Sequence, residues 1–236
     1  MIVLCSIIII ALLVRALDAS TAPTLKPTAI PTVIPSKIPT ALPTIMPTAS
    51  PTFANYLSTI AGSGAASSTG TGGLATAASV NSPSGIWADS LGNLYFTETG
   101  GNCVRKISAS TSLVSLVAGV CGAQGGSTGD GGPATSANLN NPYASISDTT
   151  GVTYISDRSN SKIRSVSVAG ILSTFAGTGA SGNAGNGGPA TSALLSAPKG
   201  LWINTNNALY FASAGANVIR SIAVSTKVIT LFAGKS

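Results

Sequence analysis

The sequence predicts an all-β fold, a β-propeller built from four-stranded antiparallel blades. Only 8% of its 236 residues are charged and 27 are glycine, a turn-rich composition that favours β structure over helical bundles. A unit marked by prolines at 83, 142 and 198 recurs three times, at spacings of 59 and 56 residues. Each unit holds four short β-branched or aromatic runs separated by Gly, Asn, Asp and Ser, which is the pattern of a propeller blade.

The N-terminal segment, residues 1–19, is predicted to be a secretory signal peptide. Its apolar run from Ile2 to Val14 is shorter than the roughly 20 residues of a membrane span, and cleavage is expected after Ala19. Arg15 follows the run and no basic residue precedes it, so an uncleaved membrane anchor is the alternative. Only in that case is the chain expected to be attached to a membrane. Otherwise the chain is expected to be secreted, at the cell surface or wall.

Residues 20–52 are predicted to form a stalk or linker. Proline recurs at every fourth position from Pro23 to Pro51, each followed by Thr or Ser. Proline fixes φ and removes an amide donor, so this segment is expected to be an extended rod. Ser and Thr beside Pro in a secreted chain indicate a mucin-like, O-glycosylated stalk, with an unmodified disordered linker as the alternative.

The partial propeller is expected over residues 53–236, with blades at about 80–120, 139–178 and 195–235. In the first unit the four strands are predicted at 85–88, 94–97, 104–108 and 113–117, joined within the blade by hairpin-sized turns. Each unit closes in Ala-Gly, at Gly119, Gly177 and Gly234. A fourth such ending, YLSTIAG, precedes the first unit, so residues 56–62 are expected to be the outer strand of a preceding blade.

One run carries a family resemblance. SPSGIWADSLGNLYFTETGGNCVRKI combines a Pro-x-Gly start, an Asp-x-x-Gly-Asn hairpin, a Tyr-Phe strand and an Asn-x-x-Arg entry to the third strand. It resembles the NHL-repeat family of β-propellers, over about residues 56–236. The resemblance implies the propeller fold and leaves the activity open.

An arginine recurs in the third strand of every unit, as Arg105, Arg164 and Arg220, whereas the acidic residue seven positions earlier changes from Glu98 to Asp157 to Ser213. A repeat architecture reuses its packing contacts, so a structural role between blades is expected for the arginines. Asp89, Asp148 and Asn204 lie in the first hairpin of each unit, where such side chains cap turns.

Cys103 opens the third strand of the first blade and Cys121 follows its fourth strand. Folding this hairpin brings both to the same end of the blade, so in an oxidising compartment a disulfide is expected. Two free thiols are the alternative, because the strand register is inferred.

The linkers GDGGPATSA, residues 129–137, and GNGGPATSA, residues 185–193, are interpreted as blade connectors. Neither contains the Lys that a Walker phosphate loop needs. Calcium would need several oxygen ligands, yet Asp130 becomes Asn186 in the next copy and Thr71 in the earlier one. Pro133 and Pro189 suit the start of a short helical turn, after which Leu139 and Leu195 are expected to fill the gap between blades.

The predicted binding surface is the propeller face that carries the loops between the second and third strands. These loops, at 99–102, 158–161 and 214–217, are expected to share it with the linkers 122–138 and 178–194, because loops on a rigid scaffold carry binding residues. The surface is neutral and hydroxyl-rich, which suits a protein or glycan. The candidate partner-binding residues are Glu98, Gly101, Asn102, Asp130, Asp157, Arg158, Asn160, Asn186 and Asn217.

The composition limits the chemistry. The chain has no histidine, which removes the commonest general base and metal ligand. The net charge is +6, but its basic residues are scattered, so no nucleic-acid partner is expected. We therefore expect a non-catalytic recognition module with no catalytic residue, cofactor or metal. The alternative is a fragment of a propeller lyase or hydrolase with a metal in the central channel.

The number of blades raises a further question. Propellers close with about 4 to 8 blades, and this sequence predicts three plus a leading strand. Either the chain is a fragment of a longer product or two arcs assemble by twofold symmetry. The extra strand at 56–62 has no obvious place in paired arcs, so the fragment is the preferred interpretation.

Overall fold

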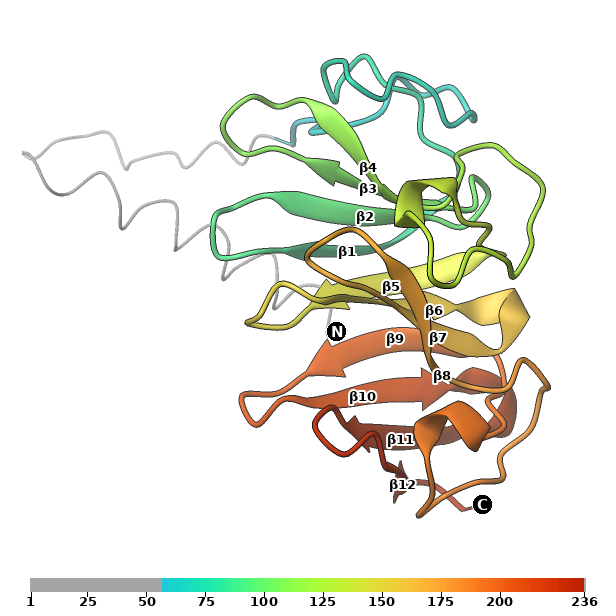
Figure 1. Ribbon diagram of the computed structural model, residues 1–236. Helices are drawn as coiled ribbons and strands as arrows, with labels where there is room; N and C mark the ends of the chain where they lie inside the picture. Colours follow the sequence, from blue (N-terminus) through green and yellow to red (C-terminus); the bar gives the residue numbers. More distant parts are fainter. Residues whose placement is uncertain (1–56, 236) are drawn as a thin grey trace, which may run out of the picture. The chain divides into compact units, whose positions relative to one another are not determined.

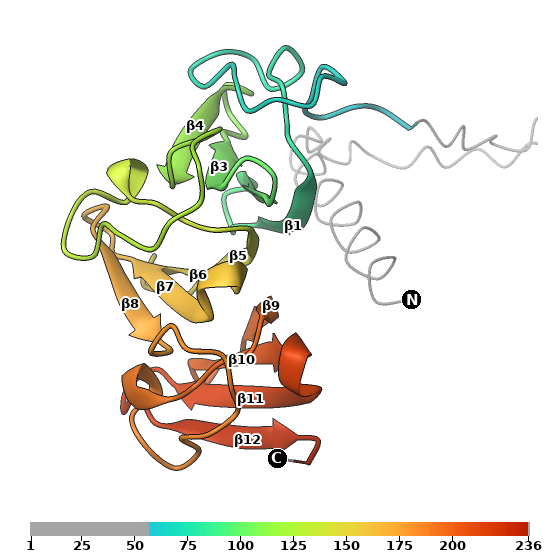
Figure 2. The ribbon, with the colours of Figure 1, turned by 90° about the vertical axis from the view of Figure 1, so that its right-hand side faces the viewer.

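The described part of the chain is an all-β arc of three propeller blades. The computed structural model describes residues 57–235; the predicted signal peptide, the predicted stalk and Tyr56 lie outside them. Three four-stranded antiparallel sheets follow one another, each with its strands in chain order (Figures 1 and 2). Within 57–235 no helix is long and apolar enough to cross a membrane.

The strands lie close to their predicted positions. Blade 1 consists of β1 (Pro83–Ala88), β2 (Leu94–Glu98), β3 (Cys103–Ile107) and β4 (Val114–Ala118). Blade 2 consists of β5 (Pro142–Ser147), β6 (Thr153–Asp157), β7 (Lys162–Val166) and β8 (Leu172–Ala176). Blade 3 consists of β9 (Pro198–Ile203), β10 (Ala208–Ser213), β11 (Val218–Ala223) and β12 (Ile229–Ala233).

The first strand of every blade starts irregularly, just after a residue with positive φ. Ser82, Asn141 and Ala197 have φ values of 50°, 47° and 46°. Each precedes a proline, which lacks the amide donor that a regular ladder needs, and the register shifts before the strand continues. The same irregularity thus recurs in all three units.

Residues 57–62 do not form the predicted outer strand. No strand pairs with them within the described chain, so they lack the ladder that would order them. The amide of Gly62 donates to the carbonyl of Ala75 at 3.0 Å, and that of Ser63 to Ala78 at 2.8 Å. The segment is therefore tied to the first blade linker rather than to a sheet.

Each Gly-rich linker runs along the outer strand of the blade that follows it. The amide of Gly131 donates to the carbonyl of Leu172 at 2.8 Å, and the amide of Leu172 to Gly132 at 2.9 Å. Gly72 and Gly187 make the same bond to Val114 and Ile229. The linkers then form the short 3-10 helices η1 (Ala134–Ser136) and η3 (Ala190–Ser192), each preceded by the predicted proline.

Apolar side chains fill the spaces between blades. Leu139 is fully buried between Val104 of blade 1 and Ile155 of blade 2. Leu195 occupies the same place between blades 2 and 3, in a cluster with Tyr154 and Phe211. Leu139 and Leu195 thus lie in the gaps for which the sequence predicted them.

Candidate functional site

The repeated arginine of blade 1 is fully buried, and both of its Nη atoms make structural contacts. Arg105 forms an ion pair with Glu98, with 2.8 Å between Nη1 and Oε1, and also donates to the carbonyls of Ser79 and Thr69. The other Glu98 oxygen accepts bonds from the Ser68 hydroxyl and the Asn81 amide, at 2.6 and 2.9 Å. This pair therefore fastens β2 and β3 to the preceding linker.

Blade 2 uses two carboxylates for the same purpose. Arg164 donates to Asp157 Oδ2 at 3.1 Å and to Asp130 Oδ1 at 2.7 Å. Burial raises the pKa of Asp157, against the opposing hydrogen bonds from Asn160, Asn140 and Arg164. Partial burial also acts to raise the pKa of Asp130, but Thr174 and Arg164 outweigh it and the net shift is downward.

Blade 3 lacks a carboxylate at this place. Arg220 is fully buried, and its Nε donates to Asn186 Oδ1 at 3.0 Å while its Nη atoms donate to the carbonyls of Leu194 and Ala184. Burial without a counter-ion lowers the pKa of its guanidinium. Ser213 replaces the acid and accepts only the backbone amide of Ser196, at 3.3 Å.

The remaining carboxylates belong to the first hairpins. Asp89 accepts the amides of Leu91 and Asn93 and lies within hydrogen-bond distance of the Tyr95 hydroxyl. Asp148 binds its own turn in the same way, and the Tyr154 hydroxyl donates to it at 3.1 Å. Burial and then the nearby carboxylate raise the pKa of both tyrosines.

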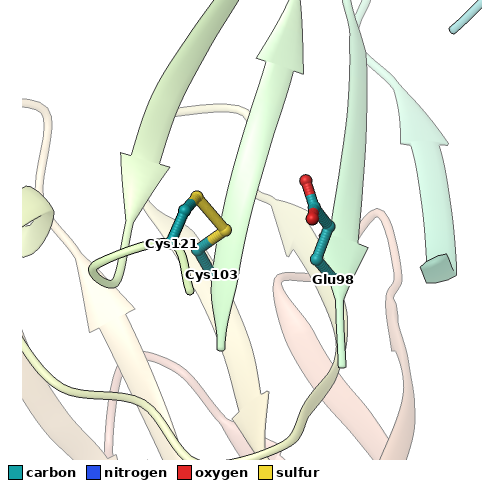
Figure 3. Close-up of side chains that lie close together, drawn as sticks. All are labelled: Glu98, Cys103 and Cys121. Carbon is teal, nitrogen blue, oxygen red and sulfur yellow. A yellow bond between two sulfur atoms is a disulfide. The ribbon is translucent and has the colours of Figure 1, made fainter. Parts of the chain in front are cut away.

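One cluster has the geometry of a three-ligand metal set. A carboxylate oxygen of Glu98 and the sulfur atoms of Cys103 and Cys121 lie within 4.8 Å of one another (Figure 3). The two sulfurs form the predicted disulfide, with a Cα–Cα distance of 5.1 Å, and both Glu98 oxygens already accept hydrogen bonds. Since metals bind thiolates rather than disulfides, the cluster as it stands is not a metal centre.

Several of the predicted partner-binding residues are inaccessible. Glu98, Asp157 and Gly101 are buried, which corrects the expectation that they face a partner. The sequence could not reveal this, because Glu98 and Asp157 are the last residues of β2 and β6 and their side chains turn inward to the arginines. Asn102 and Asn160 are half-buried and donate to the linker carbonyls of Ala123 and Gly126.

Other predicted residues lie at or near the surface but differ in whether their side chains already make hydrogen bonds within the protein. Asp130 is exposed but accepts hydrogen bonds from Arg164 and Thr174. Asn186 is exposed but accepts one from Arg220. Arg158 is half-buried, and the side chain of Asn217 is exposed. Of the nine candidates, Asn217 is therefore the one that combines exposure with no side-chain hydrogen bond inside the described chain.

The loops after the second strands carry a feature that sequence reasoning missed. In blades 2 and 3 they form short 3-10 helices, η2 (Arg158–Asn160) and η4 (Ala214–Ala216). Each loop ends with a residue in the left-handed region, at Asn102, Ser161 and Asn217, with φ of 54°, 50° and 55°. Two of the three are asparagine, which tolerates this backbone conformation, so the recurrence was a usable signal.

The predicted shared face is only partly present. Asn160 of the loop at 158–161 donates to the carbonyl of Gly126, and Lys162 Nζ, just after this loop, donates to Ser127 at 3.0 Å. A Cβ atom added at Gly179 would lie 3.7 Å from the carbonyl oxygen of Asn160. These contacts place the first halves of the linkers, residues 122–128 and 178–184, beside that loop. Their second halves turn away along β8 and β12. The candidate surface is therefore smaller than the sequence predicted.

Comparison with known proteins adds structural likenesses at low identity. A virginiamycin B lyase from Staphylococcus aureus is 14% identical, with a TM-score of 0.44. An auxiliary nutrient binding protein from Bacteroides ovatus is 17% identical, with a TM-score of 0.48, and a gluconolactonase from Xanthomonas campestris is 12% identical, with a TM-score of 0.44. The matches cover 65%, 63% and 64% of this chain but only 42%, 37% and 47% of those proteins.

No protein-family model and no curated protein matches the sequence. The chain spans less than half the length of the three proteins named above. At these identities and scores, the likenesses indicate neither a substrate nor a reaction for this chain.

Proposed function

We propose that the chain is a non-catalytic recognition module that binds a protein or glycan. One observation carries this proposal: all five carboxylates of residues 57–235 are committed to structural hydrogen bonds, in three arginine contacts and two hairpin turns. General acid–base chemistry needs a carboxyl group or another titratable group aimed at a substrate, and a metal site needs several free ligands. Within this range the carboxylates serve neither purpose.

The proposed binding surface combines the loops at 99–102, 158–161 and 214–217 with the adjoining linker segments 122–128 and 178–184. The exposed side chains on it are small and polar, such as Gln124, Ser159 and Asn217. Neutral hydroxyl and amide groups offer both donors and acceptors, which matches a sugar or a polar peptide surface. A polyanion would instead require clustered basic side chains.

A secreted or wall-associated location forms part of the proposal. The disulfide between Cys103 and Cys121 is stable in an oxidising compartment, which agrees with the predicted signal peptide. The Pro/Thr-rich segment 20–52 would then carry the arc away from the surface as a stalk. We also propose that the three units are NHL-type repeats, on the residues that carry the resemblance.

Binding of the chain to an array of glycans and cell-wall polysaccharides would test this function. A ligand so identified should bind at least about tenfold more weakly to Ser159→Arg and to Asn217→Gly, which alter the surface while keeping the loop backbone. The control Thr149→Arg places the same charge in a hairpin at the opposite end of blade 2, and it should leave the affinity unchanged. Chemical turnover of a bound glycan, or weakening by the control alone, would contradict the proposal.

A further inference from the structure

Two basic side chains lack a carboxylate partner at the end of the arc that carries the loops between the second and third strands. The three ion pairs of residues 57–235 belong to the buried Arg105 and Arg164. Arg158 and Lys199 are half-buried, and neither side chain makes a hydrogen bond within that range. The Nε atom of Arg158 is buried without a partner, whereas its two Nη atoms stay accessible. A partly buried, unpaired cation attracts an anion more strongly than one surrounded by water.

The repeat indicates what Arg158 lies against. Thr99 holds the same position in blade 1, directly after the second strand, and its hydroxyl donates to the carbonyl of Pro142 at 2.8 Å. The residue that corresponds to Pro142 in the next blade is Pro198, which is followed by Lys199. Figures 1 and 2 agree with this, since η2 lies beside the beginning of β9 in both views. Arg158 and Lys199 therefore come from adjoining segments of blades 2 and 3.

An aromatic residue adjoins the same place. Tyr143 follows Pro142 as Lys199 follows Pro198, and Lys199 Nζ lies 5.4 Å from the centroid of the Tyr143 ring. This cation–π contact holds the ammonium group, while the Tyr143 hydroxyl makes no hydrogen bond within the described chain. We call Arg158, Lys199 and Tyr143 the cationic cluster. It presents two cations and a phenol, all with free donors.

The donors of the cationic cluster suit a single carboxylate group. A guanidinium presents its N–H groups in a planar fork that matches the two oxygens of a carboxylate, and the ammonium and the phenol add further donors. No carboxylate of residues 57–235 competes for them, because all five are held in contacts elsewhere. Two cations do not make the extended basic surface that a polyanion requires.

The surroundings of the cationic cluster favour a sugar as the carrier of that carboxylate. The exposed side chains of Ser159 and Asn217 offer hydroxyl and amide groups, which pair with sugar hydroxyls. The loops at 99–102, 158–161 and 214–217 contain no apolar residue larger than alanine. A peptide usually binds through a buried aromatic or aliphatic anchor, and these loops offer no lining for one.

We propose that the cationic cluster binds the carboxylate of an acidic sugar, a uronate unit of a glycan, with Arg158 as the main contact and Lys199 and Tyr143 as supporting donors. This inference rests on the proposed recognition function and names the chemical class of its ligand. The carboxylate then separates the ligand from neutral glycans, which leave the two cations unpaired.

Paired acidic and esterified glycans test this assignment. The probes are oligosaccharides of glucuronate, galacturonate and mannuronate, each measured beside its methyl ester, which keeps the sugar but removes the negative charge. We expect at least one uronate oligosaccharide to bind, and its methyl ester to bind at least about tenfold more weakly. Arg158→Gln should weaken binding of the acid by a similar factor and leave binding of the ester unchanged, because both changes remove the same contact.

A matched variant controls for net charge. Lys227→Gln removes one positive charge from an exposed position in the hairpin between β11 and β12, at the opposite end of blade 3, and should leave both affinities unchanged. Because Arg158 makes no side-chain hydrogen bond within the described chain, Arg158→Gln should unfold in urea at the same midpoint as the parent. Its loss of affinity is then not a loss of folding.

The outcomes separate this inference from the function on which it rests. Equal affinity for acid and ester, or binding to neutral glycans or to a peptide alone, would overturn the role of the cationic cluster and leave the recognition function standing. Equal losses in Arg158→Gln and Lys227→Gln would indicate general charge attraction and would also overturn it. Chemical turnover of a bound glycan would contradict the recognition function itself.

Discussion

Replacing Glu98 by serine would test whether the buried ion pair holds blade 1 together. Both Glu98 oxygens accept bonds, from Arg105, Ser68 and the Asn81 amide. Serine could still accept the amide of residue 81, as Ser213 does in blade 3, but it would leave a fully buried guanidinium without a counter-ion. Removing one partner of a buried pair typically costs about 3 to 5 kcal/mol, so the unfolding free energy should fall by that amount.

Blade 3 also shows how such a loss is offset. Arg220 Nε donates to Asn186, whereas the Nε atom of Arg105 is buried without a partner. Thr71 stands where Asn186 stands in the third linker. Thr71→Asn alone should therefore stabilise the protein by about 1 kcal/mol, since it satisfies a buried donor. Combined with Glu98→Ser, it should recover more than that, because the amide then becomes the main acceptor for the cation.

Urea unfolding of the four oxidised proteins, followed by far-UV circular dichroism, gives the double-mutant cycle directly. A loss below about 1 kcal/mol for Glu98→Ser would refute the reasoning, since it would mean that Arg105 needs no counter-ion. A destabilising effect of Thr71→Asn in both backgrounds would show that the linker of blade 1 cannot adopt the contact seen in blade 3.

Three further predictions concern separate parts of the arc. Reducing the disulfide between Cys103 and Cys121, which lie 18 residues apart in sequence, should cost about 3 kcal/mol, and an unchanged melting temperature under reductant would exclude this. Because the folded pKa of Asp130 lies below its unfolded value of 3.8, its contribution is present above that pH and is lost as the pH falls through the folded value. Asp130→Asn should therefore reduce the loss of unfolding free energy at acid pH. The difference should be less than about 1 kcal/mol, because the carboxylate is partly exposed. An identical dependence of stability on pH in both proteins would contradict this prediction. Gly177 and Gly131 both have positive φ, but only at Gly177 would an added Cβ atom meet backbone atoms. Gly177→Ala should therefore lower the urea midpoint of unfolding clearly more than Gly131→Ala does. Equal losses in the two variants would contradict this prediction.

The repeat made most of the fold predictable. Short runs of β-branched and aromatic residues, separated by Gly, Asn, Asp and Ser, located the strands. Each run pairs with its neighbour in the chain, so no long-range information was needed. The segment 57–62 carries the same apolar pattern as β8 yet forms no strand, because a strand also requires a partner beside it. The sequence pattern shows that a segment suits a β-strand, but it does not show whether a partner strand lies beside it.

The candidate site was predicted less well, for a physical reason. Glu98 and Asp157 sit where their strands end, and sequence alone does not show whether such a side chain faces solvent or turns inward. The buried arginine seven residues later decides the question, since a buried guanidinium stabilises a carboxylate beside it. The recurrence of Arg105 and Arg164 was visible, but its consequence for the acids before them needed the register between neighbouring strands.

The metal content of the purified chain tests the central claim most directly, because that claim assigns every described carboxylate to a structural contact. Elemental analysis after dialysis against calcium, magnesium, manganese and zinc should find no metal bound in stoichiometric amount. One tightly held ion per chain, lost on substitution of any of these five carboxylates, would contradict the account and favour metal-assisted chemistry instead.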